Sequence, residues 1–197
     1  PEGRGIGAAS KMLSSSLKEM RDRGMAISTL FPSSVRVYRS KGYERSGVKL
    51  TYEVPVKEMR SGLNELKVEQ ASNEEEMILL FNERARQSNG NLERGSLLWD
   101  LITKSNGRPF YKYYIRDENQ VVGYINYQQS RSGDHIRIRD MVSSTPQSSE
   151  RILRFFSDHR TVIDTISWNG PPNDPIDFCM EEQETLLKSS RDWMVRV

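Results

Sequence analysis

The chain opens with Pro1-Glu2-Gly3-Arg4-Gly5-Ile6-Gly7-Ala8-Ala9, a stretch that leads directly into a helical pattern. Three glycines within five residues let the main chain approach a ligand closely. A helix that begins here would direct free backbone N–H groups and the positive end of its dipole at an anion. The stretch therefore predicts a backbone cradle for phosphate.

The residues around this cradle predict a short series of elements. Apolar residues at helical spacing predict a helix over roughly residues 8 to 23, with Gly24 at its C-cap. We expect a short buried strand over 25–31, a helical turn or two over 34–41, and a half-buried strand over 48–54. A phosphate loop normally follows a strand, but no strand and no initiator Met precede this one, so we expect the chain to begin inside a domain.

A second series of elements follows Ser61-Gly62, which is the expected joint between two domains, 1–62 and 63–197. We predict a helix capped by Ser72 and Glu75, an antiparallel meander of three strands, and a helix begun by Pro146. The other predicted elements are strands over 66–69, 162–168 and 193–197 and helices over 92–103 and 181–188. The last strand ends without a terminal signal, so we expect the C-terminus to be cut as well.

Composition excludes several classes of function. The net charge is +2 from 29 basic and 27 acidic residues. The overall charge therefore gives no electrostatic attraction that would favour binding to nucleic acid or to an acidic membrane. The single cysteine, Cys179, excludes an internal disulfide and reads as buried filler, and His135 and His159 lie too far apart for metal-ligand spacing. No apolar stretch approaches the length of a membrane span. We expect a cytoplasmic protein without a metal site.

The glycine stretch has three interpretations. Gly3-x-Gly5-x-x-Ala8 satisfies the letters of the dinucleotide fingerprint, but no Asp or Glu occurs from Met25 through Tyr43 to hold a ribose. The second interpretation is a plain glycine turn that precedes a helix and binds no ligand. The third interpretation is Arg4-x-x-Gly7-x-Ala9, which resembles the acetyl-CoA-binding motif of the Gcn5-related N-acetyltransferase (GNAT) superfamily.

Two further stretches carry this resemblance along the chain. The segment Phe31-Pro32-Ser33-Ser34-Val35-Arg36-Val37-Tyr38-Arg39-Ser40-Lys41-Gly42-Tyr43 is similar to the region that holds the superfamily's catalytic tyrosine. The Tyr38-x-x-x-Gly42-Tyr43 form and the segment from His159 to Pro175 resemble the enhanced intracellular survival (Eis) subfamily.

The resemblance implies an α+β fold with tandem GNAT-like domains, each a mixed, mostly antiparallel sheet flanked by helices. Residues 1–62 would be the C-terminal half of a truncated catalytic domain, and 63–197 a second domain without the cofactor motif. At the position of that motif, residues 143–149 read as a polar loop and N-cap. A third, sterol-carrier-like domain would lie outside the chain. The acceptor pocket and the general base would lie outside as well, so we expect this chain alone to be inactive.

The implied reaction is transfer of an acetyl group from acetyl-CoA to a primary amine. Tyr38 would be the general acid that protonates the CoA thiolate, although it also reads as a core tyrosine beside Val35 and Val37. The residues implied to bind the cofactor are Arg4, Gly5, Ile6, Gly7, Ala8, Ala9 and Ser33.

The resemblance also implies a homo-oligomer and leaves a small molecule or a protein amine as the acceptor. The alternative is a non-catalytic oligomerisation or interaction module in which CoA binding is vestigial. Two charged stretches read as solvated surface: the basic residues of 36–49, which otherwise would suit the 3′-phosphate of CoA, and the acidic residues of 174–182.

Overall fold

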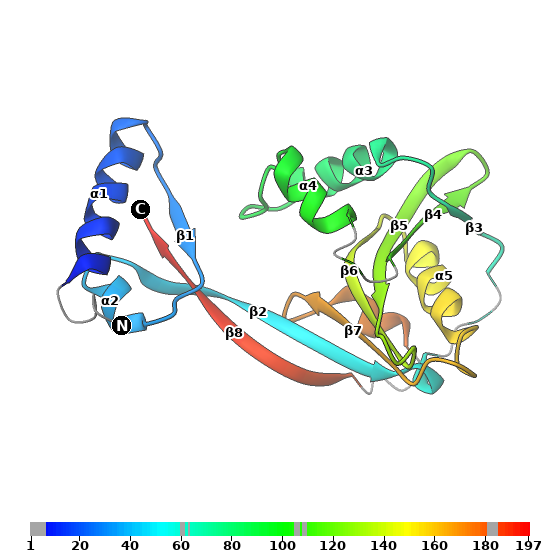
Figure 1. Ribbon diagram of the computed structural model, residues 1–197. Coiled ribbons are helices and arrows are strands. Elements are labelled where there is room, and N and C mark those ends of the chain that lie inside the picture. The colour runs from blue at the N-terminus through cyan, green and yellow to red at the C-terminus, as the bar shows by residue number, and fades with distance from the viewer. Residues whose placement is uncertain (1–6, 60–61, 63, 105–106, 108–109, 181–184) are drawn as a thin grey trace. The chain divides into compact units, whose positions relative to one another are not determined.

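The computed structural model describes residues 7–59, 62, 64–104, 107, 110–180 and 185–197 (Figure 1). Its backbone contacts gather into two compact units, of which unit 1 holds residues 1–49 with 190–197 and unit 2 holds residues 50–189. Unit 1 is therefore built from both ends of the chain, and the predicted joint at Ser61-Gly62 lies within unit 2. The assignment of residues 1–62 and 63–197 to separate domains of a family stays a prediction.

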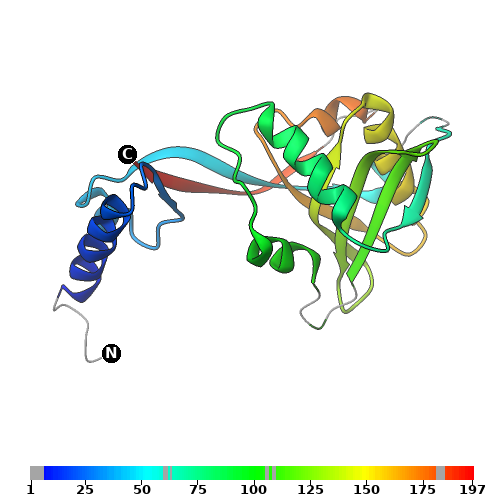
Figure 2. The same ribbon diagram turned by 90° about the horizontal axis from the view of Figure 1, so that it is seen from above.

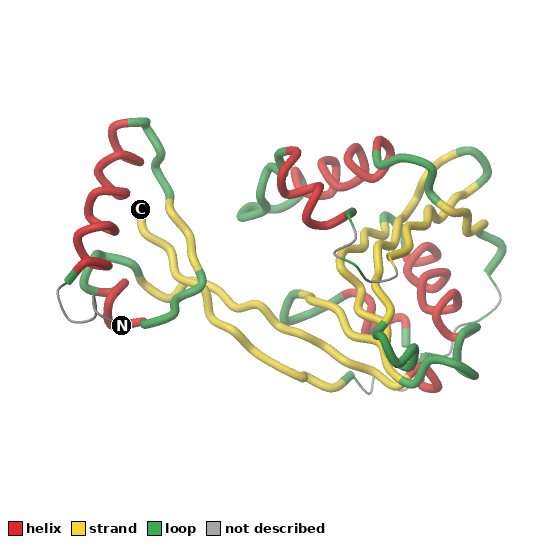
Figure 3. Tube along the Cα trace, in the orientation of Figure 1, coloured by secondary structure: helices red, strands yellow, loops and turns green. Residues whose placement is uncertain are grey.

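Unit 1 combines two helices with three strand segments (Figure 3). Helix α1 (Ala8–Asp22), strand β1 (Ser28–Leu30) and helix α2 (Val35–Arg39) come first, followed by the first part of β2 (Glu44–Pro55) and the last part of β8 (Leu186–Arg196). The strand order is β1-β8-β2, and β1 pairs antiparallel with β8 so that Ser28 lies opposite Arg196 and Leu30 opposite Met194. Met194 is fully buried there.

The structure confirms α1, α2 and β2 but changes the predicted strand over 25–31. β1 has only three residues, and Met25, Ile27 and Phe31 are 55%, 63% and 44% exposed. A short apolar run indicates a strand without showing which neighbours cover it, and within the described residues this run is largely uncovered.

Unit 2 contains strands in the order β2-β7-β6-β5-β4-β3, and the first residues of β8, beside β2, also belong to it. Its strands are β3 (Lys67–Gln70), β4 (Phe110–Asp117), β5 (Gln120–Gln129), β6 (His135–Ser143) and β7 (Thr165–Gly170), together with the end of β2. The pairs are antiparallel except β6 with β7, which is parallel and joined by helix α5 (Pro146–Ser157). The predicted meander of β4, β5 and β6 is confirmed, and the whole is an α+β fold with a mixed sheet.

Helix α5 lies on one side of this sheet and helix α3 on the other (Figure 2), and each side carries an apolar cluster. Ile152, Leu153 and Phe156 of α5 pack with alternate residues of β5 such as Ile125. Helices α3 (Glu75–Arg86) and α4 (Ser96–Thr103) cover the second apolar cluster, to which β5 contributes Tyr124. Successive side chains of a strand point to opposite faces, so β5 contributes to both cores.

Three local predictions in unit 2 are wrong. Ser72 does not cap α3, because Asn73 Oδ1 accepts the N–H of Glu75 at 3.1 Å and the N-cap residue is Glu74. The predicted helix over 181–188 falls partly outside the described residues, and its last three residues belong to strand β8. Asp174 is not solvated but 7% exposed, and it accepts hydrogen bonds from Trp168 Nε1 and Ile176 N at 2.9 and 3.1 Å. Burial raises the pKa of this carboxyl group.

Candidate functional site

The start of α1 is the part of the predicted phosphate cradle that the structure describes. Arg4, Gly5 and Ile6 lie outside the described residues, and the helix begins at Ala8 after Gly7. Gly7 has a left-handed φ of 74°, and its carbonyl accepts the N–H of Lys11 at 3.0 Å. An added Cβ would meet no described atom within 4 Å, so glycine is favoured here by its conformation and not by crowding.

The first turn of α1 leaves its N–H groups available to an anion. The first N–H groups of an α-helix have no partner within the helix, and no side chain of the described residues caps this end. Ala8 and Ala9 also place no bulky side chain there. Among the described residues, the start of α1 therefore presents uncapped backbone donors of the kind that can bind an anion.

Tyr38 lies in α2, and the turn that follows explains the spacing of its motif. Gly42 has φ 83°, and the N–H of Tyr43 returns to the carbonyl of Tyr38 at 3.2 Å while the N–H of Gly42 bonds the carbonyl of Arg39 at 3.0 Å. This pair of bonds is the Schellman arrangement, which requires a residue in the left-handed region. The Tyr38-x-x-x-Gly42-Tyr43 spacing is therefore a helix ending that returns the second tyrosine to the first.

The two tyrosines form one aromatic pair. Their ring centroids are 5.9 Å apart at an interplanar angle of 75°, an edge-to-face contact. Tyr43 is 1% exposed, and its hydroxyl lies 2.7 Å from Ser28 Oγ on β1. The Tyr38 ring is half-buried against this anchored neighbour, which assigns Tyr43 a structural role and holds Tyr38 in one place.

Ser33 is exposed in the loop between β1 and α2. Ser33, Tyr38 and residues 7–9 all belong to unit 1. No hydrogen bond or ring contact between described residues joins these three parts directly. The structure thus places the candidate residues in one unit without a direct network among them.

Two of the basic residues near Tyr38 form ion pairs at the surface. Arg39 Nε donates to both carboxylate oxygens of Glu44 at 3.0 and 3.1 Å, and Arg45 pairs with Asp192 at 3.3 Å. The Arg191 guanidinium lies 5.1 Å from the centroid of the Phe31 ring. These contacts fit the interpretation as a solvated charged face.

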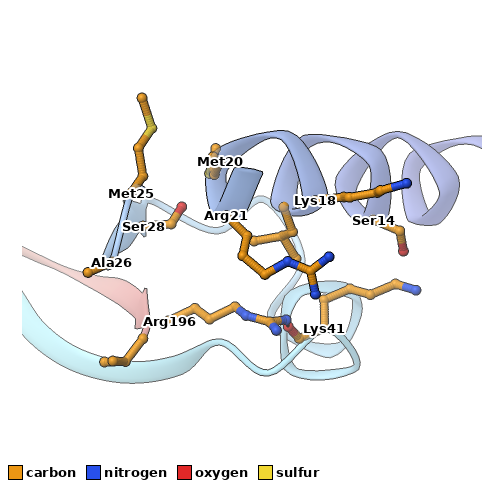
Figure 4. A pocket seen from close by; sticks show the side chains of 11 residues that line it. Ser14, Lys18, Met20, Arg21, Met25, Ala26, Ser28, Lys41 and Arg196 are labelled. Carbon is orange, nitrogen blue, oxygen red and sulfur yellow. The ribbon is translucent and has the colours of Figure 1, made fainter. Parts of the chain in front are cut away.

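Sequence reasoning missed a second feature of unit 1, a pocket of about 600 Å³ that we call the α1–β8 pocket (Figure 4). Its walls come from the second half of α1, the segment leading into β1, the turn after α2, and the end of β8. It is lined by Ser14, Leu17, Lys18, Met20, Arg21, Met25, Ala26, Ser28, Lys41, Arg196 and Val197. The spacing of Lys18 and Arg21 places them on one helix face, but nothing local indicates that Arg196 joins them.

Unit 2 carries no counterpart of the cradle at the start of α5. Thr145 caps this helix by accepting the N–H of Ser148 at 3.1 Å, and the Ser148 hydroxyl accepts the N–H of Thr145 at 3.1 Å. The predicted polar loop and N-cap are confirmed, and the two side chains satisfy two backbone donors of the helix start. Burial raises the pKa of the half-buried Cys179 thiol, as expected of a filler and not of a nucleophile.

The described residues offer neither a metal-binding cluster nor a membrane-spanning helix. Across the described ranges, no group of three or more His, Cys, Asp or Glu side chains is placed to hold a metal ion. Among the helices of those same ranges, none combines the length and the apolar character needed to cross a membrane.

Comparisons with known proteins place these features in a family. A family model described as an acetyltransferase (GNAT) domain matches residues 90–197, more than half of the chain, and a second model with the same description matches residues 1–46. No curated protein matches the chain.

Solved structures cover the whole chain. A GCN5-related N-acetyltransferase from Anabaena variabilis is 29% identical with a TM-score of 0.94, and the match covers 100% of this chain and 52% of that one. One from Kribbella flavida is 23% identical with a TM-score of 0.81, covering 100% and 49%. Eis1 from Mycobacterium abscessus is 20% identical with a TM-score of 0.76, covering 100% and 53%.

This chain therefore spans about half the length of these solved relatives. Its mixed sheet flanked by helices, and the match of a GNAT model to more than half of its residues, lead to the same assignment. The chain belongs to the GNAT acetyltransferase family.

Proposed function

We propose that the protein is an acetyl-CoA-dependent N-acetyltransferase acting on a primary amine. The observation that carries this proposal is the start of α1, where a left-handed Gly7 leads into a helix whose first N–H groups are uncapped. The GNAT match over residues 1–46 includes this site. The acceptor is a small molecule or a protein amine, and the protein is a homo-oligomer in this proposal.

The phosphate end of the cofactor is the part that residues of this chain would hold. The backbone from Gly5 to Ala9 would hold the pyrophosphate, with Arg4 adding a fixed positive charge and Ser33 a hydrogen bond farther along. Acetyl-CoA, when bound, supplies an acetyl group activated as a thioester, which the amine attacks directly. The cradle would anchor and orient the cofactor, and it would not activate the thioester.

Tyr38 is the proposed general acid. Its Oη would hold a proton and give it to the departing thiolate. A phenol suits this task because its O–H can donate a proton to the thiolate that forms as the thioester breaks. The edge-to-face contact with the buried Tyr43 ring supports the role, since it fixes the position of the Tyr38 ring.

We also propose a tandem arrangement similar to that of the Eis subfamily. Residues 1–62 would belong to the catalytic GNAT domain and 63–197 to a second GNAT-like domain without cofactor. Separate matches of GNAT models to residues 1–46 and 90–197 support two domains. The self-capped start of α5 supports the absence of a cofactor from the second.

The test of the catalytic role compares two tyrosines that touch each other. In the full-length protein, we expect Tyr38→Phe to lower kcat about 100-fold or more, the usual contribution of a general acid, and to change CoA affinity less than twofold. The matched variant Tyr43→Phe removes a hydroxyl that bonds Ser28, so we expect it to lower the melting temperature and to keep most of the turnover.

Steady-state kinetics with a panel of primary amines, read by mass spectrometry, measure kcat. Calorimetric titration of CoA measures the affinity for CoA. Unchanged turnover of Tyr38→Phe would overturn the assigned role. If CoA neither binds nor raises the melting temperature of the wild-type protein, the alternative of a non-catalytic module holds instead.

A further inference from the structure

The α1–β8 pocket gathers positive charge from three separate parts of unit 1. Lys18 and Arg21 come from α1, Lys41 from the turn after α2, and Arg196 from the end of β8. None of the lining residues, all of which the structure describes, is acidic. Figure 4 shows Arg21 extending from α1 toward Lys41 and Arg196.

Few carboxylates neutralise these four side chains. Arg21 Nε lies 3.7 Å from Asp22 Oδ1, but both side chains are more than half exposed, and such pairs contribute little. Within the described part of the chain, Lys18 and Lys41 have no ion-pair partner. The pocket therefore keeps most of its positive charge.

Arg196 is held in place toward the pocket. Its Nη1 donates to the carbonyl oxygen of Lys41, and a Cβ added to Gly42 would stand 3.3 Å from the same nitrogen. The backbone of Arg196 is fixed as well, because it pairs with Ser28 across β1 and β8. A guanidinium that is already ordered loses less side-chain freedom when it binds an anion.

Like charges brought together repel one another, and an anion in the pocket removes that repulsion. Two guanidinium groups offer planar pairs of donors that match phosphate oxygens, and the Ser14 hydroxyl on α1 adds a neutral donor. Four positive charges in about 600 Å³ fit several linked phosphates better than a single monoanion.

We propose that the α1–β8 pocket binds the oligophosphate group of a small-molecule ligand, at a site separate from the start of α1 at residues 7–9. The cradle uses the start of α1, whereas the pocket uses residues from Ser14 onward and the end of β8. The ligand is either an inorganic oligophosphate or a nucleotide. This proposal does not depend on acetyl transfer.

The test uses inorganic tripolyphosphate and ATP, each titrated calorimetrically into the full-length protein with and without saturating CoA. In the double variant Lys18→Gln, Arg21→Gln we expect the Kd to rise about tenfold or more, since two charge-assisted contacts are lost. The matched control Lys11→Gln removes a charge from an exposed position of α1 that does not line the pocket. We expect it, and Arg4→Gln in the cradle, to keep the wild-type Kd.

A tighter Kd for ATP than for tripolyphosphate identifies a nucleotide, and the reverse an inorganic ligand; both support the site. The proposal is overturned if neither probe binds at millimolar concentration, if Lys11→Gln weakens binding as much as the double variant, or if CoA or Arg4→Gln abolishes it. CoA binding itself is measured in the same titrations, so failure of the pocket and failure of the cradle are distinguished.

Discussion

Gly42 is the residue that holds the proposed acid Tyr38 in position. Its φ of 83° completes the turn that brings Tyr43 back against Tyr38, and its missing side chain leaves room for the Arg196 guanidinium. Any other residue at this position would be strained by the positive φ, and its Cβ would crowd the Arg196 guanidinium. One glycine therefore supports the aromatic pair on one side and the α1–β8 pocket on the other.

We expect Gly42→Ala to lower the free energy of unfolding by about 1–2 kcal/mol, the usual cost of a left-handed conformation for a residue with a Cβ. Urea denaturation measures it. Gly62→Ala is the control, because its Cβ would meet no described atom within 4 Å and its φ is not positive, and we expect a neutral or slightly stabilising effect. Equal stability of Gly42→Ala and wild type would contradict the prediction.

The Tyr38-x-x-x-Gly42-Tyr43 spacing is local, so the sequence could point to the structural role of Tyr43, while the catalytic role of Tyr38 stays a prediction. The sequence did not identify Arg196, since the bond from Arg196 to the Lys41 carbonyl joins residues 155 positions apart. Helical and strand periodicity report only on neighbours in sequence. A pocket assembled from α1 and β8 therefore lies beyond such reasoning.

At the scale of elements, His135 joins three strands of unit 2. Its Nδ1 lies 2.7 Å from Thr165 Oγ1 and its Nε2 3.0 Å from Ser167 Oγ, so β6 is bonded through a side chain to β7. Glu53 on β2 lies opposite Ser167, and its carboxylate is 3.9 Å from the ring. Burial lowers the pKa of His135, against the opposite effect of Glu53.

This lowered pKa predicts a pH dependence of stability. Unfolded histidine takes up a proton near its ordinary pKa of about 6.5, and the folded state does so only at lower pH, so the unfolded state binds more protons in between. Stability should therefore fall as the pH drops through about 6.5 toward the folded pKa. We expect His135→Gln to reduce that fall, as measured by urea denaturation at pH 7.5, 6.5 and 5.5. A wild-type slope in the variant would contradict the assignment.

The elements with long, regular periodicity were predictable: α1, the meander of β4, β5 and β6, and α5 all lie where the pattern placed them. The segment before Trp193 was not. Leu186, Leu187 and Lys188 follow helix-forming residues in sequence, but they lie in β8, where Lys188 pairs with Glu53. Strand pairing outweighed a weak local preference, as tertiary context commonly does.

At the scale of the whole molecule, unit 1 depends on a segment distant in sequence, whereas unit 2 is one continuous segment. We expect truncation after Ser189 to remove the pairing partner of β1 and the buried Met194. Hydrogen exchange should then accelerate across residues 7–49, while the peptides of β4, β5 and α5 stay protected and provide the internal control. Unchanged protection of residues 28–30 would show that β8 is dispensable to unit 1.

The pairing of β1 with β8 also sets an order of events during synthesis. Leu30 cannot form its sheet pairing until its partner Met194 has been synthesised. A ribosome that adds about 5–20 residues per second needs roughly 8–33 s to extend the chain from Leu30 to Met194. In that interval the strands of unit 2 can pair with one another, while the segment with Met25, Ile27 and Phe31 lacks β8, the partner strand that the described residues give to β1. A nascent chain paused before residue 190 would thus present this apolar segment to chaperones.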